Sequence, residues 1–389
     1  MTEKDPLPTS PITNRWEHPK ERRSLALTET ILYRGTDQAA YNHHPQLCYH
    51  HGSLFATWSN GYRDEDVPGQ RSLIAESRDL GRTWSQARPL VDRLPGEHRH
   101  GIVTNGGILS HAEGLTAYYA YYDRTYTGML MYYAAGGNGT LGQTKDRSID
   151  PEKSYVGSLT STDGRTWTET PHRVPKAFLN LSPEPLPDGS LLLPGFATHL
   201  RTTDPRGVEG WQRSGLPGLF MDESDDTEGH LINLRQAGYA QMHHEASFFV
   251  TDDGVIHLMM RTGQPWLSVS ESRDNGATWS RPARTRYTDA VSKNKFGRLP
   301  DGRFYGLTTP EPKSPRTPLV LAISEDGIRF GRHFVIGDQP NFLARLPGMH
   351  KYGRYGYPHL CLAEDQVCII YSINKEDIAF VRFPLKELA

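Results

Sequence analysis

Ser77-Arg78-Asp79-Leu80-Gly81-Arg82-Thr83-Trp84 recurs as Ser272-Arg273-Asp274-Asn275-Gly276-Ala277-Thr278-Trp279, and both segments fit S-x-D-x-G-x-T-W. Each copy follows a strand-like apolar run. The Asp carboxylate can accept hydrogen bonds from turn amides, Gly supplies a positive φ, and Trp packs beneath the turn. The phrase therefore predicts a tight turn between two strands. Shorter or degenerate copies follow at 161–167, 324–330 and 203–211.

A second repeat alternates with these turns. It consists of an apolar stretch, a turn at Asp-Gly or its equivalent, and an alternating apolar strand, which together indicate a β-hairpin. The six instances turn at Gly52, Gly114, Gly189, Gly254, Gly302 and Gln366. We expect one four-stranded blade for each hairpin, and we expect the last strand, 378–385, to close the ring beside an early strand at 28–34.

From residue 25 to 388 the chain resembles the sialidase superfamily, whose propellers carry such Asp-box turns. The resemblance implies an all-β, six-bladed β-propeller with Asp-box turns. We therefore expect one propeller domain over 25–389, preceded by a disordered segment over the polar, Pro-rich residues 1–24. The fold does not fix the activity, because Asp-box turns also occur in lyases and in binding propellers.

The bulk composition excludes several classes of partner. The formal net charge is −2, so no global positive field attracts nucleic acid. No apolar run is long enough to span a membrane, and no signal peptide is visible. Only three cysteines are present, which suits a reducing compartment. We expect a cytoplasmic protein; the sequence does not fix the oligomeric state.

The sialidase resemblance assigns roles to four residues. Glu245, in His-Glu-Ala-Ser before a hairpin, takes the place of the base that activates a tyrosine nucleophile, and Tyr357, in Gly-Tyr-Pro-His, takes the place of that nucleophile. Arg261 and Arg316 match arginines that hold a substrate carboxylate. A neutral phenol suits an anionic sugar, because an anionic nucleophile would be repelled.

Two parts of the sialidase pattern are missing. The first arginine of the family is replaced by His43-His44, and the acid expected before the first Asp-box turn is replaced by Gln70-Arg71. We expect His44 or Asp66, the latter next to Asp64 and Glu65, to act as the acid, and Arg71 to bind a carboxylate. The remaining residues expected to contact substrate are His43, Gln70, His100 and His359.

Three functions follow from these residues. The first is a sialidase-like glycoside hydrolase that removes an acidic terminal sugar, of the sialic or uronic acid type, from an oligosaccharide. The second is a polysaccharide lyase that cleaves a uronate-containing glycan by β-elimination, with His44, His100, Tyr357, Arg71 and Arg261 as its site. The third is a carbohydrate-binding propeller without catalysis. Hydrogen bonding between Glu245 and Tyr357 would favour the hydrolase.

We expect no cofactor and no metal. Adjacent residues of a strand face opposite sides, so each His-His pair should offer one inward ligand, and no Cys or Asp completes a set at ligand spacing.

Overall fold

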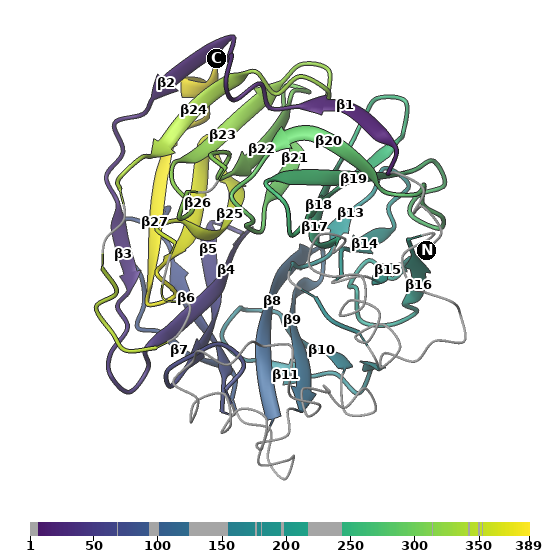
Figure 1. The fold of residues 1–389 in the computed structure, drawn as a ribbon. Coiled ribbons are helices and arrows are strands. Elements are labelled where there is room, and N and C mark those ends of the chain that lie inside the picture. The colour runs from purple at the N-terminus through teal and green to yellow at the C-terminus, as the bar shows by residue number, and fades with distance from the viewer. Residues whose placement is uncertain are drawn as a thin grey trace, which may run out of the picture.

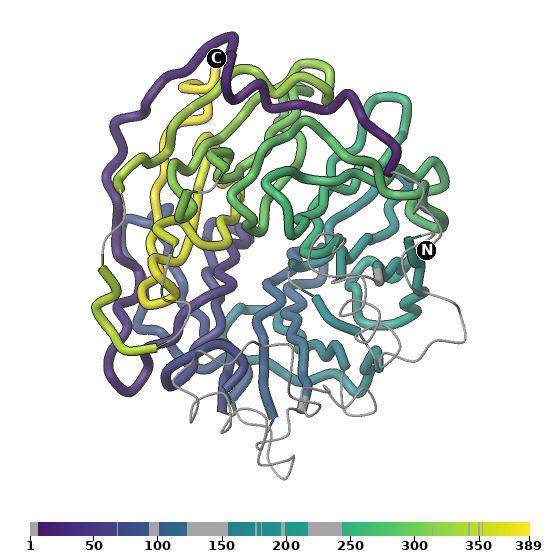
Figure 2. Tube along the Cα trace, viewed as in Figure 1, coloured from purple at the N-terminus to yellow at the C-terminus, as the bar shows by residue number. Residues whose placement is uncertain are grey.

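The computed structural model describes residues 7–67, 69–92, 101–123, 155–175, 177–179, 181–195, 198–216, 243–312, 314–340, 343–348, 351 and 353–389. Within these ranges the structure is built of strands, apart from a short 3₁₀ helix, η3 (Leu385–Leu388). The strands form six sheets around a common centre (Figure 1; the same path is traced in Figure 2). The all-β, six-bladed propeller is thereby confirmed.

The first three blades follow one another along the chain. Each is an antiparallel meander of four strands, to which blade 2 adds a fifth strand. Blade 1 contains β4 (Tyr41–His50), β5 (Ser53–Gly61), β6 (Arg71–Ser77) and β7 (Arg88–Val91). Blade 2 contains β8 (Gly101–His111), β9 (Gly114–Asp123), β10 (Tyr155–Ser161) and β11 (Thr168–Glu169), with β12 (Val174–Pro175) also pairing with β10. Blade 3 contains β13 (Glu184–Pro185), β14 (Leu191–Leu193), β15 (Thr198–Thr202) and β16 (Gln212–Gly215).

The last three blades each include a strand from the beginning of the chain. Blade 4 contains β17 (His244–Val250), β18 (Ile256–Arg261), β19 (Trp266–Ser272) and β20 (Ala283–Thr288), with β1 (Thr9–Thr13) outside β20. Blade 5 contains β21 (Lys295–Arg298), β22 (Phe304–Thr308), β23 (Leu319–Ser324) and β24 (Arg332–Gly337), with β2 (Glu21–Ser24) outside β24. Blade 6 contains β25 (Gly356–Ala363), β26 (Gln366–Ile373), β27 (Asp377–Pro384) and β3 (Thr30–Tyr33).

Two further expectations hold. All six predicted hairpins form, since each turn joins the first and second strands of a blade. The ring closes as expected, because β3 pairs antiparallel with β27, with Tyr33 opposite Ile378. Closure of this kind satisfies edge groups that an open ring would leave unpaired.

The expectation of disorder over residues 1–24 is wrong for the described residues 7–24. β1 and β2 add as parallel strands to the outer edges of blades 4 and 5 (purple in Figure 1). Ile12 is buried in the core between blades 4 and 5, and Trp16 is buried against blade 5 with its indole N–H donating to Glu311 at 2.8 Å. The polar composition was misleading because an edge strand is held largely by backbone hydrogen bonds.

The Asp-box turns have the predicted chemistry. In the first copy Asp79 accepts from the Thr83 amide at 2.9 Å and from the Thr83 hydroxyl at 2.6 Å, while Ser77 Oγ accepts from the Gly81 amide at 2.7 Å. Asp163, Asp204, Asp274 and Asp326 accept from turn amides in the same way. These turns join the third and fourth strands of blades 1 to 5. Blade 6 takes its fourth strand from the N-terminal part of the chain, so it has no such turn.

Each Asp-box glycine also packs against the preceding blade. A Cβ built on Gly81 would lie 2.3 Å from Cε1 of Phe380 on β27, so only glycine allows this approach. The equivalent neighbours are Phe55 for Gly164, Tyr118 for Gly207, Leu192 for Gly276 and Phe249 for Gly327. The turns thus pack each blade against its neighbour.

We expect Gly81→Ala to destabilise the protein more than Gly52→Ala. Both glycines have φ of 83°, but a Cβ on Gly52 would meet nothing within 4 Å. Gly52→Ala should cost about 1 kcal/mol for the left-handed backbone. Gly81→Ala should cost about 1–3 kcal/mol more, because it overpacks the contact with Phe380. Urea unfolding of both variants measures the difference, and equal free energies of unfolding would contradict the inter-blade contact.

Candidate active site

In three blades a β-bulge with a left-handed residue directs a side chain to the centre. His44, Glu245 and Tyr357 have φ of 53°, 52° and 51°. Each lies where the pairing of the first two strands of its blade shifts register, between His43 and Gln46, His244 and Ser247, and Gly356 and His359. Such a bulge re-aims a side chain, at a cost of about 1–2 kcal/mol for a left-handed non-glycine residue.

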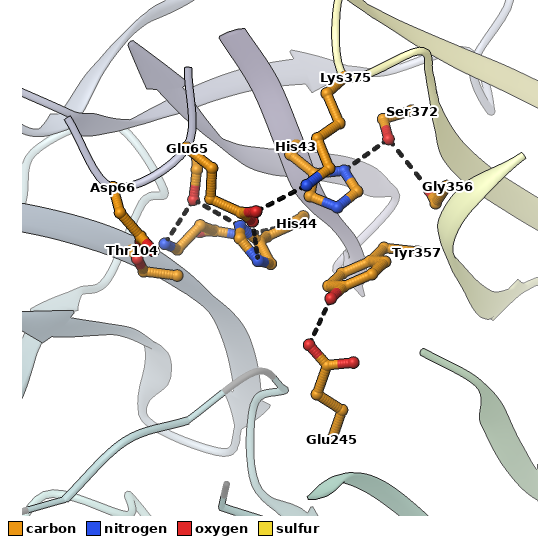
Figure 3. Close-up of polar contacts among 12 residues, drawn as sticks. His43, His44, Glu65, Asp66, Thr104, Glu245, Gly356, Tyr357, Ser372 and Lys375 are labelled. Carbon is orange, nitrogen blue, oxygen red and sulfur yellow. Dashed lines mark hydrogen bonds and ion pairs between the residues drawn. The ribbon is translucent and has the colours of Figure 1, made fainter. Parts of the chain in front are cut away.

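Tyr357, Glu245 and Arg261 form one hydrogen-bonded group (Figure 3 draws the tyrosine–glutamate bond). The Tyr357 hydroxyl donates to Glu245 Oε1. Arg261 Nη1 donates to Glu245 Oε2 at 2.5 Å and to the Tyr357 oxygen at 2.9 Å. Glu245 and Tyr357 are each 5% exposed. Three of the four residues assigned roles by the sialidase resemblance therefore meet, although they come from blades 4 and 6.

This group contains a neutral phenol beside an ionised carboxylate. Burial and the Glu245 charge raise the pKa of Tyr357 well above its usual range, although Arg261 opposes them. Burial acts to raise the pKa of Glu245, but the Arg261 charge, His244 and the hydrogen bond from Tyr357 together lower that pKa to about 2. Glu245 can therefore accept the phenol proton when the tyrosine oxygen begins to form a bond.

A second group adjoins the first. The His43 ring lies 4.1 Å from the Tyr357 ring, and the His44 ring lies 5.1 Å from it, edge to face. His44 Nε2 is 3.5 Å from Glu65 Oε1, and Lys375 Nζ donates to Glu65 Oε2 at 2.6 Å (Figure 3). The bulge thus turns both histidines towards Tyr357, so the expectation of one inward histidine per pair is wrong here.

The protonation states of this second group follow from burial and charge. Burial lowers the pKa of His43 well below its usual range and lowers that of His44 to about 4, against the effect of Glu65. Burial acts to raise the pKa of Glu65, but Lys375 and His44 hold it well below its ordinary value. At neutral pH the histidines are uncharged and Glu65 is ionised.

Positive charge also reaches this centre from blade 5. The Arg316 guanidinium lies 5.3 Å from the centre of the Tyr357 ring, so Arg316 reaches the site as expected. Lys293 Nζ lies 5.7 Å from that ring centre, on a side chain that is 0% exposed. Sequence reasoning missed Lys293, because it lies in a loop without a recognisable motif.

Lys293→Met should give a pH-dependent gain in stability. Burial lowers the folded-state pKa of Lys293 to about 7 from 10.5, so folding disfavours its charge below pH 10.5. The penalty is complete below pH 7 and is lost as the pH rises towards 10.5. The gain from Lys293→Met should therefore shrink by about 1.4 kcal/mol per pH unit above 7. Urea unfolding from pH 6 to pH 10 measures it, with Lys20→Met at an exposed position as the control. A gain for Lys293→Met that does not change with pH would contradict the burial of charge.

Three predicted substrate contacts have other partners. The Arg71 Nε donates to Asn60 at 3.0 Å, and its Nη1 lies 3.9 Å from Asp92. Gln70 is 1% exposed, and its amide bonds Asp66, Val103 and Thr104. His359 Nδ1 accepts from the Leu47 amide at 3.3 Å. Gln70 and His359 thus hydrogen-bond to groups of the protein, and Arg71 is held by its own blade, since Asn60 and Asp92 flank it there.

Asp66 and His100 complete the predicted set. The Tyr122 hydroxyl donates to Asp66 Oδ1, and Figure 3 draws His44 and Glu65 between Asp66 and Tyr357. The carboxylate that contacts His44 is therefore that of Glu65 and not that of Asp66, the next residue in the sequence. His100 lies outside the described residues.

The three cysteines are free thiols, as the small number suggested. Within the part of the chain that is described, no helix has the length and hydropathy needed to cross a membrane.

Comparison with known proteins agrees with this architecture. Residues 52–369 match the BNR repeat-like domain family, so the chain belongs to that family. A search of curated proteins gives no significant match.

Solved structures with the same fold include sialidases. The Hadza microbial sialidase superposes with a TM-score of 0.67 at 17% identity, over 92% of this chain and 69% of its own. The NanB sialidase from Streptococcus pneumoniae gives 0.61 at 14% identity, over 92% and 71%. A protein of unknown function from Dyadobacter fermentans gives 0.62 at 17% identity, over 91% and 97%. At these identities the likeness establishes the propeller fold alone.

Proposed function

We propose that the protein is a retaining glycoside hydrolase that removes an acidic terminal sugar, of the sialic or uronic acid type, from an oligosaccharide. The observation that carries this proposal is the hydrogen bond from the Tyr357 hydroxyl to Glu245 in a buried setting. A protein that only bound sugar would have no need for a carboxylate poised to deprotonate a tyrosine.

The reaction proceeds in two steps. Tyr357 Oη forms a bond to the anomeric carbon as its proton passes to Glu245, and the glycosidic bond breaks with the leaving oxygen taking a proton from the acid. Water then attacks the same carbon and gives a proton to the acid residue, which now acts as the base. The tyrosine oxygen leaves and recovers its proton from Glu245, and the sugar departs with retained configuration.

His44 is the acid in this proposal. Its ring lies 5.1 Å from the ring of Tyr357, and Glu65 lies where it stabilises the imidazolium. Asp66 is less suited because its carboxylate accepts from Tyr122.

Arg261 and Arg316 hold the substrate carboxylate. Arg261 already contacts the tyrosine oxygen at 2.9 Å, so it lies beside the anomeric centre. Arg316 faces the same ring from blade 5. Guanidinium groups bind carboxylates through paired hydrogen bonds, which accounts for a preference for an acidic sugar in the absence of the family's first arginine.

β-Elimination is a second candidate, favoured by one observation. His44 is buried and uncharged beside Tyr357, and an uncharged imidazole can remove the proton next to a uronate carboxylate. The products of that reaction carry a carbon–carbon double bond that absorbs ultraviolet light.

A substrate panel distinguishes these functions. Wild-type protein is incubated with aryl sialosides, aryl uronides and uronate oligosaccharides, and released phenol and ultraviolet absorbance are recorded separately. Hydrolysis predicts phenol release without unsaturated product. An increase in ultraviolet absorbance would show elimination instead of hydrolysis. If neither phenol nor absorbance changes, the protein is a sugar-binding propeller.

The pH profile separates the two reactions independently. As an acid, His44 must be protonated, so kcat/KM for hydrolysis should fall about tenfold per pH unit above a pKa of about 4. As a base it must be uncharged, so elimination should rise through pH 4 and persist at neutral pH. Initial rates from about pH 3 to pH 7 measure this, and a hydrolase with a flat profile would contradict the role of His44.

A further inference from the structure

His43 converges with His44 and Glu65, although the proposed glycosidase chemistry uses only His44 and Glu65. Each offers one ligand atom, and the three atoms lie within 4.8 Å of one another. Both histidines reach the same place because the bulge at His44 breaks the alternation of the strand. Two imidazoles and a carboxylate on one side of a site form a ligand set suited to a transition metal ion.

The orientation of the two rings strengthens this reading. His43 Nδ1 is bonded to Ser372 Oγ at 2.6 Å, and His44 Nδ1 lies 3.3 Å from both Tyr41 Oη and Ser59 Oγ. Hydroxyl groups thus hold the outer nitrogen of each ring, as outer partners do in metal sites. His43 Nε2 is buried without a hydrogen-bond partner, on a residue that is 0% exposed.

Charge around the site limits which ion it can take and how tightly. Lys375 Nζ donates to Glu65 Oε2 at 2.6 Å, and the positive charges of Lys293 and Arg316 lie near enough to affect His43. These cations oppose a divalent ion, so oxygen-seeking Mg²⁺ and Ca²⁺ gain little here, whereas imidazole-binding ions retain their ligands.

We propose that His43 Nε2, His44 Nε2 and a carboxylate oxygen of Glu65 bind a divalent transition ion of the Zn²⁺ class, with at least one coordination position left open. This proposal rests on the three side chains and their partners. An imidazole that binds an ion through Nε2 cannot donate a proton there, so the ion-bound form is distinct from the form in which His44 acts as the acid.

Co²⁺ titration of the metal-free full-length protein tests the site, because bound Co²⁺ gives visible absorption that depends on its ligands. We expect one equivalent bound at the site, displaced by Zn²⁺. His43→Gln and Glu65→Gln should each weaken binding about tenfold or more. His172→Gln, which changes an exposed histidine, should leave binding unchanged.

Lys375→Met gives the sharpest outcome, because it should tighten Co²⁺ binding by about tenfold through release of Glu65 and removal of an opposing charge. A misfolded variant cannot produce tighter binding, and thermal melting identifies any of the losses that come from unfolding. The proposal is overturned if the wild type binds no Co²⁺, if folded His43→Gln binds it as well as the wild type, or if Lys375→Met binds it more weakly.

Discussion

Tyr357→Phe is expected to lower kcat for release of an acidic sugar by about 10³-fold or more, because the variant keeps the aromatic ring but loses the attacking oxygen. KM should change little, since Arg261 and Arg316 remain to hold the carboxylate. Phenol release from an aryl glycoside, followed under saturating substrate, measures the change.

Tyr355→Phe is the matched control for this experiment. Tyr355 is also buried, but its oxygen accepts from the Gln339 amide rather than contacting Glu245. The control should retain activity within a few fold. Equal activity of Tyr357→Phe and the wild type would show that Tyr357 is not the nucleophile. Equal loss of activity in Tyr357→Phe and Tyr355→Phe would show damage to the fold.

Arg261→Met is expected to destabilise the protein by about 3–5 kcal/mol, because it leaves the Glu245 carboxylate buried without its charge partner. The two side chains are 14% and 7% exposed, so solvent compensates little for the loss. The equilibrium free energy of unfolding in urea at neutral pH measures the effect.

A second substitution tests the cause. Adding Glu245→Gln to Arg261→Met removes the unpaired charge and should recover much of the lost stability, so the two changes are strongly non-additive. Arg273→Met removes a surface partner of Asp253, with side chains 72% and 63% exposed, and should cost less than about 1 kcal/mol. A loss in Arg261→Met that Glu245→Gln leaves unchanged would contradict the ion pair as its source.

The repeats predicted the fold well because they are local. An Asp-box turn such as 77–84 is held by bonds between residues a few positions apart, so its structure can be read from the phrase itself. The outer strands β1 and β2 were missed because their pairing depends on an edge hundreds of residues away, and their own sequence carries no apolar alternation.

The site was predicted only where the resemblance supplied a position. Glu245, Arg261 and Tyr357 meet as expected, whereas Arg71 is held by Asn60 and Asp92. Choosing Glu65 rather than its neighbour Asp66 would have required knowing which way each side chain of this loop points. The bulge that brings His43 and His44 together interrupts the strand period, so strict alternation predicted the wrong arrangement. Pro45 lies inside this bulge, and a proline within a strand is a signal for a bulge or an edge strand.

Trapping the covalent intermediate tests the central role of Tyr357 most directly. The protein is incubated with glycosyl fluorides of sialic and uronic acid type that carry a second fluorine next to the anomeric carbon, which slows release of the sugar from the enzyme. Intact mass and peptide mapping then locate the added sugar. The account predicts one sugar bound to Tyr357 and none on Tyr357→Phe; an adduct on another residue, or turnover of the parent aryl glycoside without any adduct, would contradict it.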